Sequence, residues 1–200
     1  MTVLHSAPAT ASFNTEVDKK WLSRGVTEIR SVLGFPGLML PSKSLHLIIM
    51  AGFEFERAAE VISRFEPAKL TIAHGSSTQS VSPEHYASNK SYVEDIQKFL
   101  VSRGVLFEDI GTFEFSCLDP YLSSQQILDY VSGLVDDNII LCPLNTKMST
   151  VGAAIAGLSW PRMQICYAQA AEYNLDGYAK PGERIVLVSL EDFNISLEDF

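Results

Sequence analysis

The polar turn over residues 145–150 combines side chains that suit anion binding. Lys147 supplies a positive charge, and Ser149 and Thr150 supply hydroxyls. An apolar run over 139–142 precedes the turn, and a helix rich in glycine and alanine follows it. Because a helix N-terminus presents unbonded N–H groups and the positive end of the dipole, this order of elements predicts an anion site. The alternative is an ordinary connection in which Ser149 merely caps the helix.

A second turn, Gly52-Phe53-Glu54, follows the apolar run over 45–51. In open α/β sheets, ligands bind beyond the carboxyl ends of the strands, where the strand order reverses. If the strand order is 3-2-1-4-5, this point lies between the first and fourth strands, so the two turns meet there. The sequence therefore predicts these ligand contacts: Gly52, Phe53, Glu54, Asn145, Thr146, Lys147, Ser149 and Thr150.

An enzymatic interpretation rests on three titratable residues near predicted strand ends. Glu54, His74 and Asp119 are candidates for acid–base or nucleophilic chemistry. Each also has a structural alternative, because Glu54 and Asp119 suit helix N-termini and His74 suits a loop cap. His46 lies inside an apolar run and is predicted to be a satisfied core residue. The spacing of these residues matches no metal-ligand pattern, so no metal site is predicted.

Several nucleotide and catalytic motifs are absent from the chain. There is no G-x-G-x-x-G after the first predicted strand, which argues against a standard NAD site. There is no G-x-x-x-x-G-K-[ST] and no G-x-S-x-G, which excludes a P-loop NTPase and a hydrolase nucleophile elbow. The sequence therefore leaves the cofactor unknown.

Composition restricts the partners. The chain has 200 residues, of which 46% are hydrophobic, and a net charge of −9, which argues against a protein that coats duplex DNA. No apolar run approaches the ~20 residues that span a bilayer, so no membrane partner is predicted. The three cysteines, Cys117, Cys142 and Cys166, are too widely spaced for a disulfide framework or a clustered zinc site. A cytoplasmic location is the prediction.

Apolar runs and amphipathic stretches alternate along most of the chain. This alternation predicts an α/β fold, Rossmann-like and doubly wound, with a mainly parallel sheet and helices on both faces, over residues 45–192. Strands are expected at 45–51, 69–73, 105–110, 138–142, 162–167 and 184–190. Helices are expected at 54–65, 89–102 and 121–135 and after the turn at 145–150, with a polar loop over 76–88.

The ends of the chain are assigned separately. Residues 1–44 are expected to form an N-terminal arm with a helix over 19–33, either as an extension of this domain or as the end of a missing upstream domain, and 193–200 a C-terminal tail. The arm carries many apolar residues for a solvated segment, so it is expected to pack on the main domain, on a second subunit or on a lost domain. A homo-oligomer is therefore predicted.

The two turns, with the helix after the second, resemble those of the ligand-sensing Rossmann-like domains of CRISPR systems, called CARF domains. The resemblance covers residues 45–167. In that family the turns contact a cyclic oligonucleotide and the domain works as a homodimer. It implies that Asn145, Thr146, Lys147 and Ser149 contact a ligand. Where the family often has Gly-Gly-Thr-Lys, this chain has Leu-Asn-Thr-Lys.

Three functions remain open from the sequence. The first is a domain that binds a small anionic ligand, such as a nucleotide or another phosphorylated metabolite, at the ends of strands one and four. The second is an enzyme, a hydrolase or transferase, that acts on a nucleotide, nucleoside or activated sugar. The third is a structural or assembly role. A carboxylate and a histidine converging on one ligand position would favour the enzyme.

Overall fold

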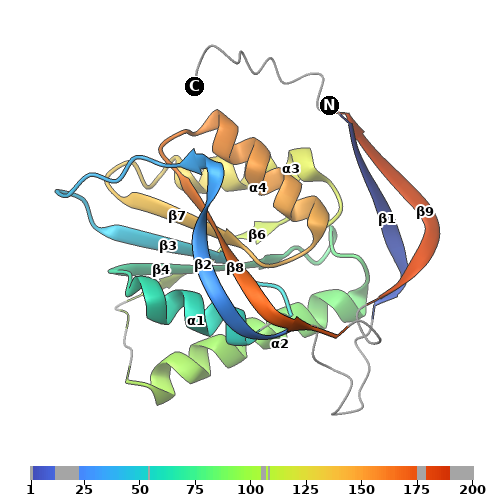
Figure 1. Ribbon diagram of the computed structural model, residues 1–200, viewed down its shortest axis with the longest axis horizontal. Coiled ribbons are helices and arrows are strands. Elements are labelled where there is room, and N and C mark those ends of the chain that lie inside the picture. Colours follow the sequence, from blue (N-terminus) through green and yellow to red (C-terminus); the bar gives the residue numbers. More distant parts are fainter. Residues whose placement is uncertain are drawn as a thin grey trace.

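The chain forms an α/β fold around a mostly parallel mixed sheet, as seen in a computed structural model (Figure 1). The structure describes residues 2–11, 23–53, 55–104, 107, 109–174 and 179–189. The strands are β1 (Thr2–Ala11), β2 (Ser23–Pro36), β3 (Leu45–Met50), β4 (Lys69–Gly75), β5 (Ile110–Gly111), β6 (Glu114–Phe115), β7 (Asn138–Pro143), β8 (Gln164–Tyr173) and β9 (Ala179–Ser189). The helices are α1 (Phe55–Phe65), α2 (Pro83–Ser102), α3 (Pro120–Val131) and α4 (Lys147–Ser159).

The seven-stranded sheet has the order β2-β8-β7-β3-β4-β5, and β6 also pairs with β4. Strand β2 is antiparallel to β8, and the remaining neighbours are parallel. Strand β3 lies at the centre, between β4 and β7. The chain runs outward from β3 through β4 to β5 and then returns to β7 on the other side. The parallel strands therefore have the expected order 3-2-1-4-5, in which the ends of the first and fourth strands, and so the two predicted turns, lie next to each other.

Each face of the sheet is buried under a pair of helices (Figure 1). On β3, Leu47 and Ile49 belong to the core that includes residues of α1 and α2, and Ile48 and Met50 belong to the core with α3 and α4. Adjacent residues of a strand point to opposite faces, so a strand buried on both faces is a continuous apolar run. The run over 45–51 was assigned correctly as a central strand for this reason.

Proline and a capping side chain begin two of the helices. Asp119 accepts bonds from the N–H groups of the first turn of α3, and Ser82 accepts one from His85 at the start of α2; a proline follows each cap. The prediction that Asp119 is a helix cap is confirmed. The predicted loop over 76–88 is too long, because α2 starts at Pro83 and not at Asn89. The first two turns of α2 are mostly polar, so their sequence did not indicate a helix.

The helix predicted over 19–33 is wrong for the residues that the structure describes. From Ser23 onward the chain is strand β2, which pairs along β8. Val26 and Ile29 pack against the core, but Leu33 is 98% exposed, so the apolar residues do not share one helical face. Strand β8 lacks a further parallel neighbour, and β2 satisfies its backbone groups there. The packing of this arm on a second subunit or a lost domain stays a prediction.

Four expected segments differ from the observed strands or fall outside the description. Residues 2–11 form β1, which pairs with β9 in a separate two-stranded sheet. The strand predicted at 184–190 therefore starts earlier, at Ala179, and lies outside the main sheet. The strand predicted at 162–167 corresponds to β8, which starts at Gln164 and extends to Tyr173. Where a strand was predicted at 105–110, the described residues contain the two-residue strand β5, Ile110–Gly111. The predicted tail over 193–200 lies outside the described residues. No described helix is long and apolar enough to cross a membrane.

Candidate functional site

The carboxyl ends of β3 and β7 lie side by side, because these strands are neighbours in parallel register. The N–H of Leu144 donates to the carbonyl oxygen of Met50 at 3.0 Å. A Cβ at Gly52 would overlap the Leu144 carbonyl group. The two turns predicted from the sequence therefore meet, but they meet in direct backbone contact. Gly52 serves this close approach of two chain segments.

The side chains of Asn145 and Thr146 are engaged within the protein. Asn145 Nδ2 donates to the carbonyl oxygen of Ala51 at 2.5 Å, and its Oδ1 accepts from the N–H of Thr146 at 2.8 Å. Thr146 Oγ1 donates to the carbonyl oxygen of Cys117 at 2.9 Å and accepts from the N–H of Ser149 at 3.2 Å. These contacts hold the turn in one geometry.

Thr146, and not Ser149, is the N-cap of α4. The alternative interpretation of Ser149 as the cap is therefore wrong. Ser149 is fully buried, and its hydroxyl donates to the carbonyl oxygen of Thr146 at 2.9 Å. Thr150 is exposed, and its hydroxyl donates to the same oxygen at 3.0 Å. A capping residue has extended backbone angles, and the sequence alone does not show which of two nearby hydroxyls adopts them.

Lys147 is exposed in the first turn of α4, where the helix dipole is positive. Strand β1 brings His5 close to it, and burial together with the positive charge of Lys147 lowers the pKa of His5. Figure 1 shows the β1–β9 ribbon beyond the carboxyl ends of the parallel strands. Lys147 at the helix N-terminus is therefore near enough to His5 for its charge to affect the pKa of that histidine. His5 was not among the predicted contacts, because nothing in the sequence of residues 2–11 indicated a strand.

Asn89 is the polar residue at this edge that the sequence analysis overlooked. It is fully buried in α2, and its Nδ2 donates to the carbonyl oxygens of Ala51 at 2.7 Å and of Gly52 at 3.0 Å. Its Oδ1 accepts from the N–H of Gly75 at 2.7 Å. One side chain thus fastens the end of β3 to the end of β4. Its signal was present: a polar residue at an inward-facing helical position beside His85 and Val93.

The structure describes two of the three candidate catalytic residues, His74 and Asp119. Glu54 lies outside the described residues. Asp119 is occupied as the cap of α3. His74 is half-buried, and its Nδ1 is 3.1 Å from the carbonyl oxygen of Gly75. Among the described residues, no three side chains of metal-binding type come together.

Aromatic side chains gather next to the tip of β3. The Phe53 ring contacts the rings of His85 and Tyr92 edge to face, with centroids 4.7 Å and 5.8 Å away. His85 is 2% exposed, and burial lowers its pKa to about 4, so it is neutral at pH 7. It lies in α2, although the sequence placed it in a loop. Phe53 thus has aromatic neighbours at the predicted site.

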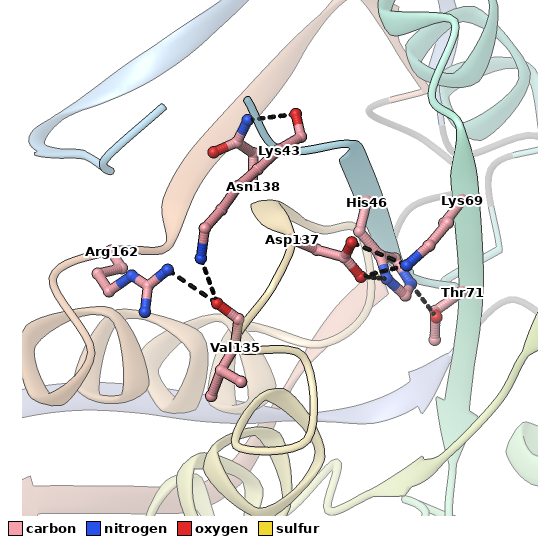
Figure 2. A network of polar contacts seen from close by, with 8 residues as sticks. All are labelled: Lys43, His46, Lys69, Thr71, Val135, Asp137, Asn138 and Arg162. Atoms are coloured by element: carbon pink, nitrogen blue, oxygen red, sulfur yellow. Dashed lines mark hydrogen bonds and ion pairs between the residues drawn. The ribbon is translucent and has the colours of Figure 1, made fainter. Parts of the chain in front are cut away.

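A second polar cluster, which we call the amino-end network, lies at the opposite end of the sheet (Figure 2). Lys69 Nζ donates to both carboxylate oxygens of Asp137, at 2.8 Å and 3.0 Å. His46 Nδ1 donates to Asp137 at 3.3 Å, which leaves His46 Nε2 to accept from Thr71 Oγ1 at 2.7 Å. Thr71 in turn accepts from the hydroxyl of Tyr130 at 2.8 Å. His46 is thus a satisfied core residue, as predicted.

The amino-end network is held by electrostatics. Burial lowers the pKa of His46 despite the nearby carboxylate, so its ring is neutral at pH 7. Burial would raise the pKa of Asp137, but hydrogen bonds from Lys69 and His46 lower it. The order Thr71, His46, Asp137 has the connectivity of a nucleophilic triad. Thr71 is fully buried within β4, however, so a substrate has no access to its hydroxyl.

The loop before β7 is fastened by a neighbouring set of bonds (Figure 2). Lys43 Nζ and Arg162 Nη2 both donate to the carbonyl oxygen of Val135, at 2.5 Å and 3.0 Å. Asn138 Nδ2 donates to the carbonyl oxygens of Lys43 and Leu40. These bonds tie the segment before β3 to the segment before β7. Their role is structural, since each cation is bound to a backbone oxygen.

The three cysteines carry free, buried thiols. Burial raises the pKa of Cys117 to about 12. A hydrogen bond with Cys166 and burial raise the pKa of Cys142 well above its usual value. The thiolate is the reactive form of cysteine, so the raised pKa values of Cys117 and Cys142 disfavour a nucleophilic role for either residue. Cys142 and Cys166 are buried within the core.

A cavity of about 820 Å³ lies between α1 and α2, away from the predicted site. Phe55 and Phe99 form part of its wall, and Glu56, Glu60 and Glu66 are among its lining residues. None of the predicted contacts in the described part of the chain lines it. Three carboxylates against the single cation of Arg103 disfavour an anion there by like-charge repulsion. The anion prediction therefore depends on the start of α4 and not on this cavity.

Comparison with known proteins adds no family to this description. No protein-family model matches the chain, and no curated protein matches it with significance.

Proposed function

We propose that this chain is a Rossmann-like, doubly wound domain that binds a small phosphorylated ligand, such as a nucleotide, at the N-terminus of α4. The observation that carries the proposal is the position of Lys147. It is exposed at the start of α4, beside the point where the strand order reverses, and His5 lies close to it. Positive charge at a helix N-terminus favours an anionic group.

The proposal narrows the set of contacts predicted from the sequence. Asn145, Thr146 and Ser149 bond within the protein, so their assigned role is to shape the turn. The phosphate is assigned to Lys147, to the backbone N–H groups at the start of α4 and to His5. A planar group of the ligand would lie toward Phe53, which follows the contact between Gly52 and Leu144.

Substitution of Lys147 tests the assignment. A charged hydrogen bond to a phosphate is worth ~1.5–3 kcal/mol, so Lys147→Ala should weaken binding by roughly tenfold to a hundredfold. Nucleotides and sugar phosphates would be titrated into both proteins by calorimetry. Lys90→Ala is the matched control, because Lys90 is also exposed but lies on α2. Equal affinity of wild type and Lys147→Ala for a phosphorylated compound would place the site elsewhere.

A spectroscopic measurement separates the site from a general charge effect. The positive charge of Lys147 contributes to the lowered pKa of His5, and a bound phosphate would oppose this effect. The pKa of His5, measured by NMR, should therefore rise on addition of the ligand that calorimetry identifies. An unchanged pKa of His5 would remove this histidine from the site.

A further inference from the structure

Helices α1 and α2 lie side by side against the same core, and the cavity of about 820 Å³ lies between them (Figure 1). Small-molecule sites usually have volumes of about 300–1,000 Å³. The residues that line the cavity lie in α1, in the turn after it and around the C-terminal end of α2. The phosphate proposal concerns the start of α4, so this cavity is a second region that is large enough for a ligand.

Apolar side chains form most of the wall of this cavity. Phe55 and Phe99 meet edge to face, with ring centroids 5.0 Å apart. Ile62 and Leu100 also line the cavity and belong to the buried core. In small-molecule sites a wall of this kind holds the body of the ligand, and a few polar groups fix its orientation. The cavity is therefore suited to a ligand with an apolar body.

The charged groups at the cavity are mainly negative. Among the described residues that line it, three carboxylates meet one guanidinium: Glu56, Glu60, Glu66 and Arg103. Glu60 is bonded to Arg64 at 3.2 Å, but both side chains of this pair are largely exposed, and such a pair contributes little to stability. A bound cation can therefore compete for Glu60, and the excess of negative charge favours a positively charged ligand.

Arg103 shows that a positive group is accommodated at this wall. Its guanidinium lies over the ring of Phe99, with Cζ 5.2 Å from the ring centroid. The face of an aromatic ring carries partial negative charge and attracts a cation. This contact is independent of the carboxylates, and it favours the same sign of charge. An apolar wall, an aromatic face and an excess of carboxylates together suit an organic cation.

We propose that the cavity between α1 and α2 binds a small organic cation, in which an ammonium or guanidinium group is attached to an apolar body. The apolar body packs against Phe55 and Phe99, and the positive group lies near Glu60 and Glu66. The proposal does not rest on phosphate binding, because it involves other residues and a ligand of opposite charge. Failure of either proposal leaves the other unaffected.

Three probes that share a naphthalene body and differ in charge test this proposal. They are naphthylmethylammonium, which is positive, naphthylmethanol, which is neutral, and naphthylacetate, which is negative. Each is titrated into the isotopically labelled full chain and followed by NMR. The ammonium should bind at least about tenfold more tightly than the alcohol, and the acetate should bind more weakly than the alcohol. The chemical shifts that the ammonium changes should centre on α1 and the C-terminal end of α2.

Three results of these titrations would overturn the proposal. Equal affinity for the three probes would mean that the cavity selects the apolar body and not the charge. Shift changes centred on the start of α4, or on another face, would place the cation elsewhere. Absence of binding by the ammonium at about 5 mM would mean that the cavity is not a cation site.

Substitutions of opposite sign test which groups recognise the charge. The double variant Glu60→Gln, Glu66→Gln should weaken binding of the ammonium at least about tenfold, because two attractive charges are lost. Its affinity for the neutral alcohol should not change. Arg103→Gln removes the like charge and should strengthen binding of the ammonium by about threefold. Weaker binding by Arg103→Gln contradicts the proposed balance of charge.

The matched control is the double variant Glu94→Gln, Asp95→Asn. Both residues are exposed on α2, do not line this cavity, and change the net charge by the same amount as the first double variant. The control should bind the ammonium as the wild type does. If both double variants lose affinity equally, the effect is that of the overall charge of the chain, and the proposal is wrong.

Discussion

The two ends of the seven-stranded sheet bury polar side chains of different chemistry. At the amino end, Asp137 bonds the ring of His46 and the amine of Lys69, so titratable groups meet one another. At the carboxyl end, the neutral amides of Asn89 and Asn145 bond backbone groups. The amino-end cluster pairs the carboxylate of Asp137 with the amine of Lys69. The asparagines at the carboxyl end complete the hydrogen bonding of backbone groups at the strand ends.

This difference bears on where a ligand can bind. A buried charge depends on its partner, because removing one member of the pair leaves the other uncompensated. The amino-end network therefore favours a closed, static arrangement. Neutral amides hold the strand ends without using the nearby charge, and Lys147 remains exposed. The carboxyl end combines fixed geometry with an available cation, which is the combination that pre-organised binding needs.

Each end also contains a glycine that admits no Cβ without movement, but the atoms that would have to move differ. A Cβ at Gly111 would overlap the hydroxyls of Tyr130 and Thr71, which are side-chain atoms. A Cβ at Gly52 would overlap the backbone carbonyl of Leu144. Side chains can move aside more readily than a strand end can. The carboxyl end is therefore expected to tolerate less change than the amino end.

The largest expected effect is that of Asn89→Ala. It removes three hydrogen bonds and leaves the carbonyl of Gly52 and the N–H of Gly75 without this partner, whereas the carbonyl of Ala51 still accepts from Asn145. Each buried group left unsatisfied costs ~1–3 kcal/mol, so the free energy of unfolding should fall by about 4 kcal/mol. Urea denaturation followed by circular dichroism measures this. A loss of less than about 1 kcal/mol would mean that Asn89 does not fasten the strand ends.

Asn89→Asp sharpens this result. The carboxylate can still accept from the N–H of Gly75, but it cannot donate to the carbonyls of Ala51 and Gly52. It should therefore destabilise the domain, although the shape of the side chain is kept. Lys90→Ala, on the exposed face of the same helix, is the control and should change the free energy of unfolding by at most about 0.5 kcal/mol.

The second effect is a loss of stability in acid. The folded-state pKa of His85 is about 4, below its usual value of 6.5, so protonation favours the unfolded state. The contribution of neutral His85 to the free energy of unfolding is fully present above pH 6.5 and is lost as the pH falls toward 4. It amounts to about 3 kcal/mol. In His85→Phe this part of the pH dependence should disappear, while the part due to the lowered pKa of His46 remains.

Denaturation at several pH values between 4 and 7.5 measures this slope. If His85→Phe keeps the full slope of the wild type, the acid sensitivity arises at the amino end of the sheet and the contrast between the two ends is reversed.

The smallest of the three effects is that of Asp137→Ala. The variant removes the bonds to His46 and Lys69, but Lys69 is 55% exposed and water can replace its partner. The free energy of unfolding should therefore fall by about 2 kcal/mol, chiefly through His46. Thermal and urea denaturation check this, with the exposed Asp136→Ala as control. A larger loss than for Asn89→Ala would show that the charged end dominates stability.

The sequence predicted the elements that are buried on both faces. The runs over 45–51 and 138–142 are β3 and β7, and the helix predicted at 54–65 corresponds to α1 from Phe55 onward. Burial on two faces leaves an unambiguous apolar run, and burial on one face of a helix leaves a clear period. Strand β2 was missed because it is an edge strand with one apolar side chain, Leu33, in solvent. Its structure depends on the neighbouring β8 and not on its own pattern.

The sequence by itself determined that residues 139–150 hold a buried strand and a polar turn with Lys147, followed by a helix, and the structure starts that helix earlier than expected, at Lys147. These are local properties of apolar runs and capping residues. The tertiary structure alone decided that Asn89 fastens two strand ends, that Thr146 is the cap, and that the charge of Lys147 acts on His5. Such contacts join residues distant along the chain. The packing of the sheet and its helices brings them together, and no local pattern records that packing.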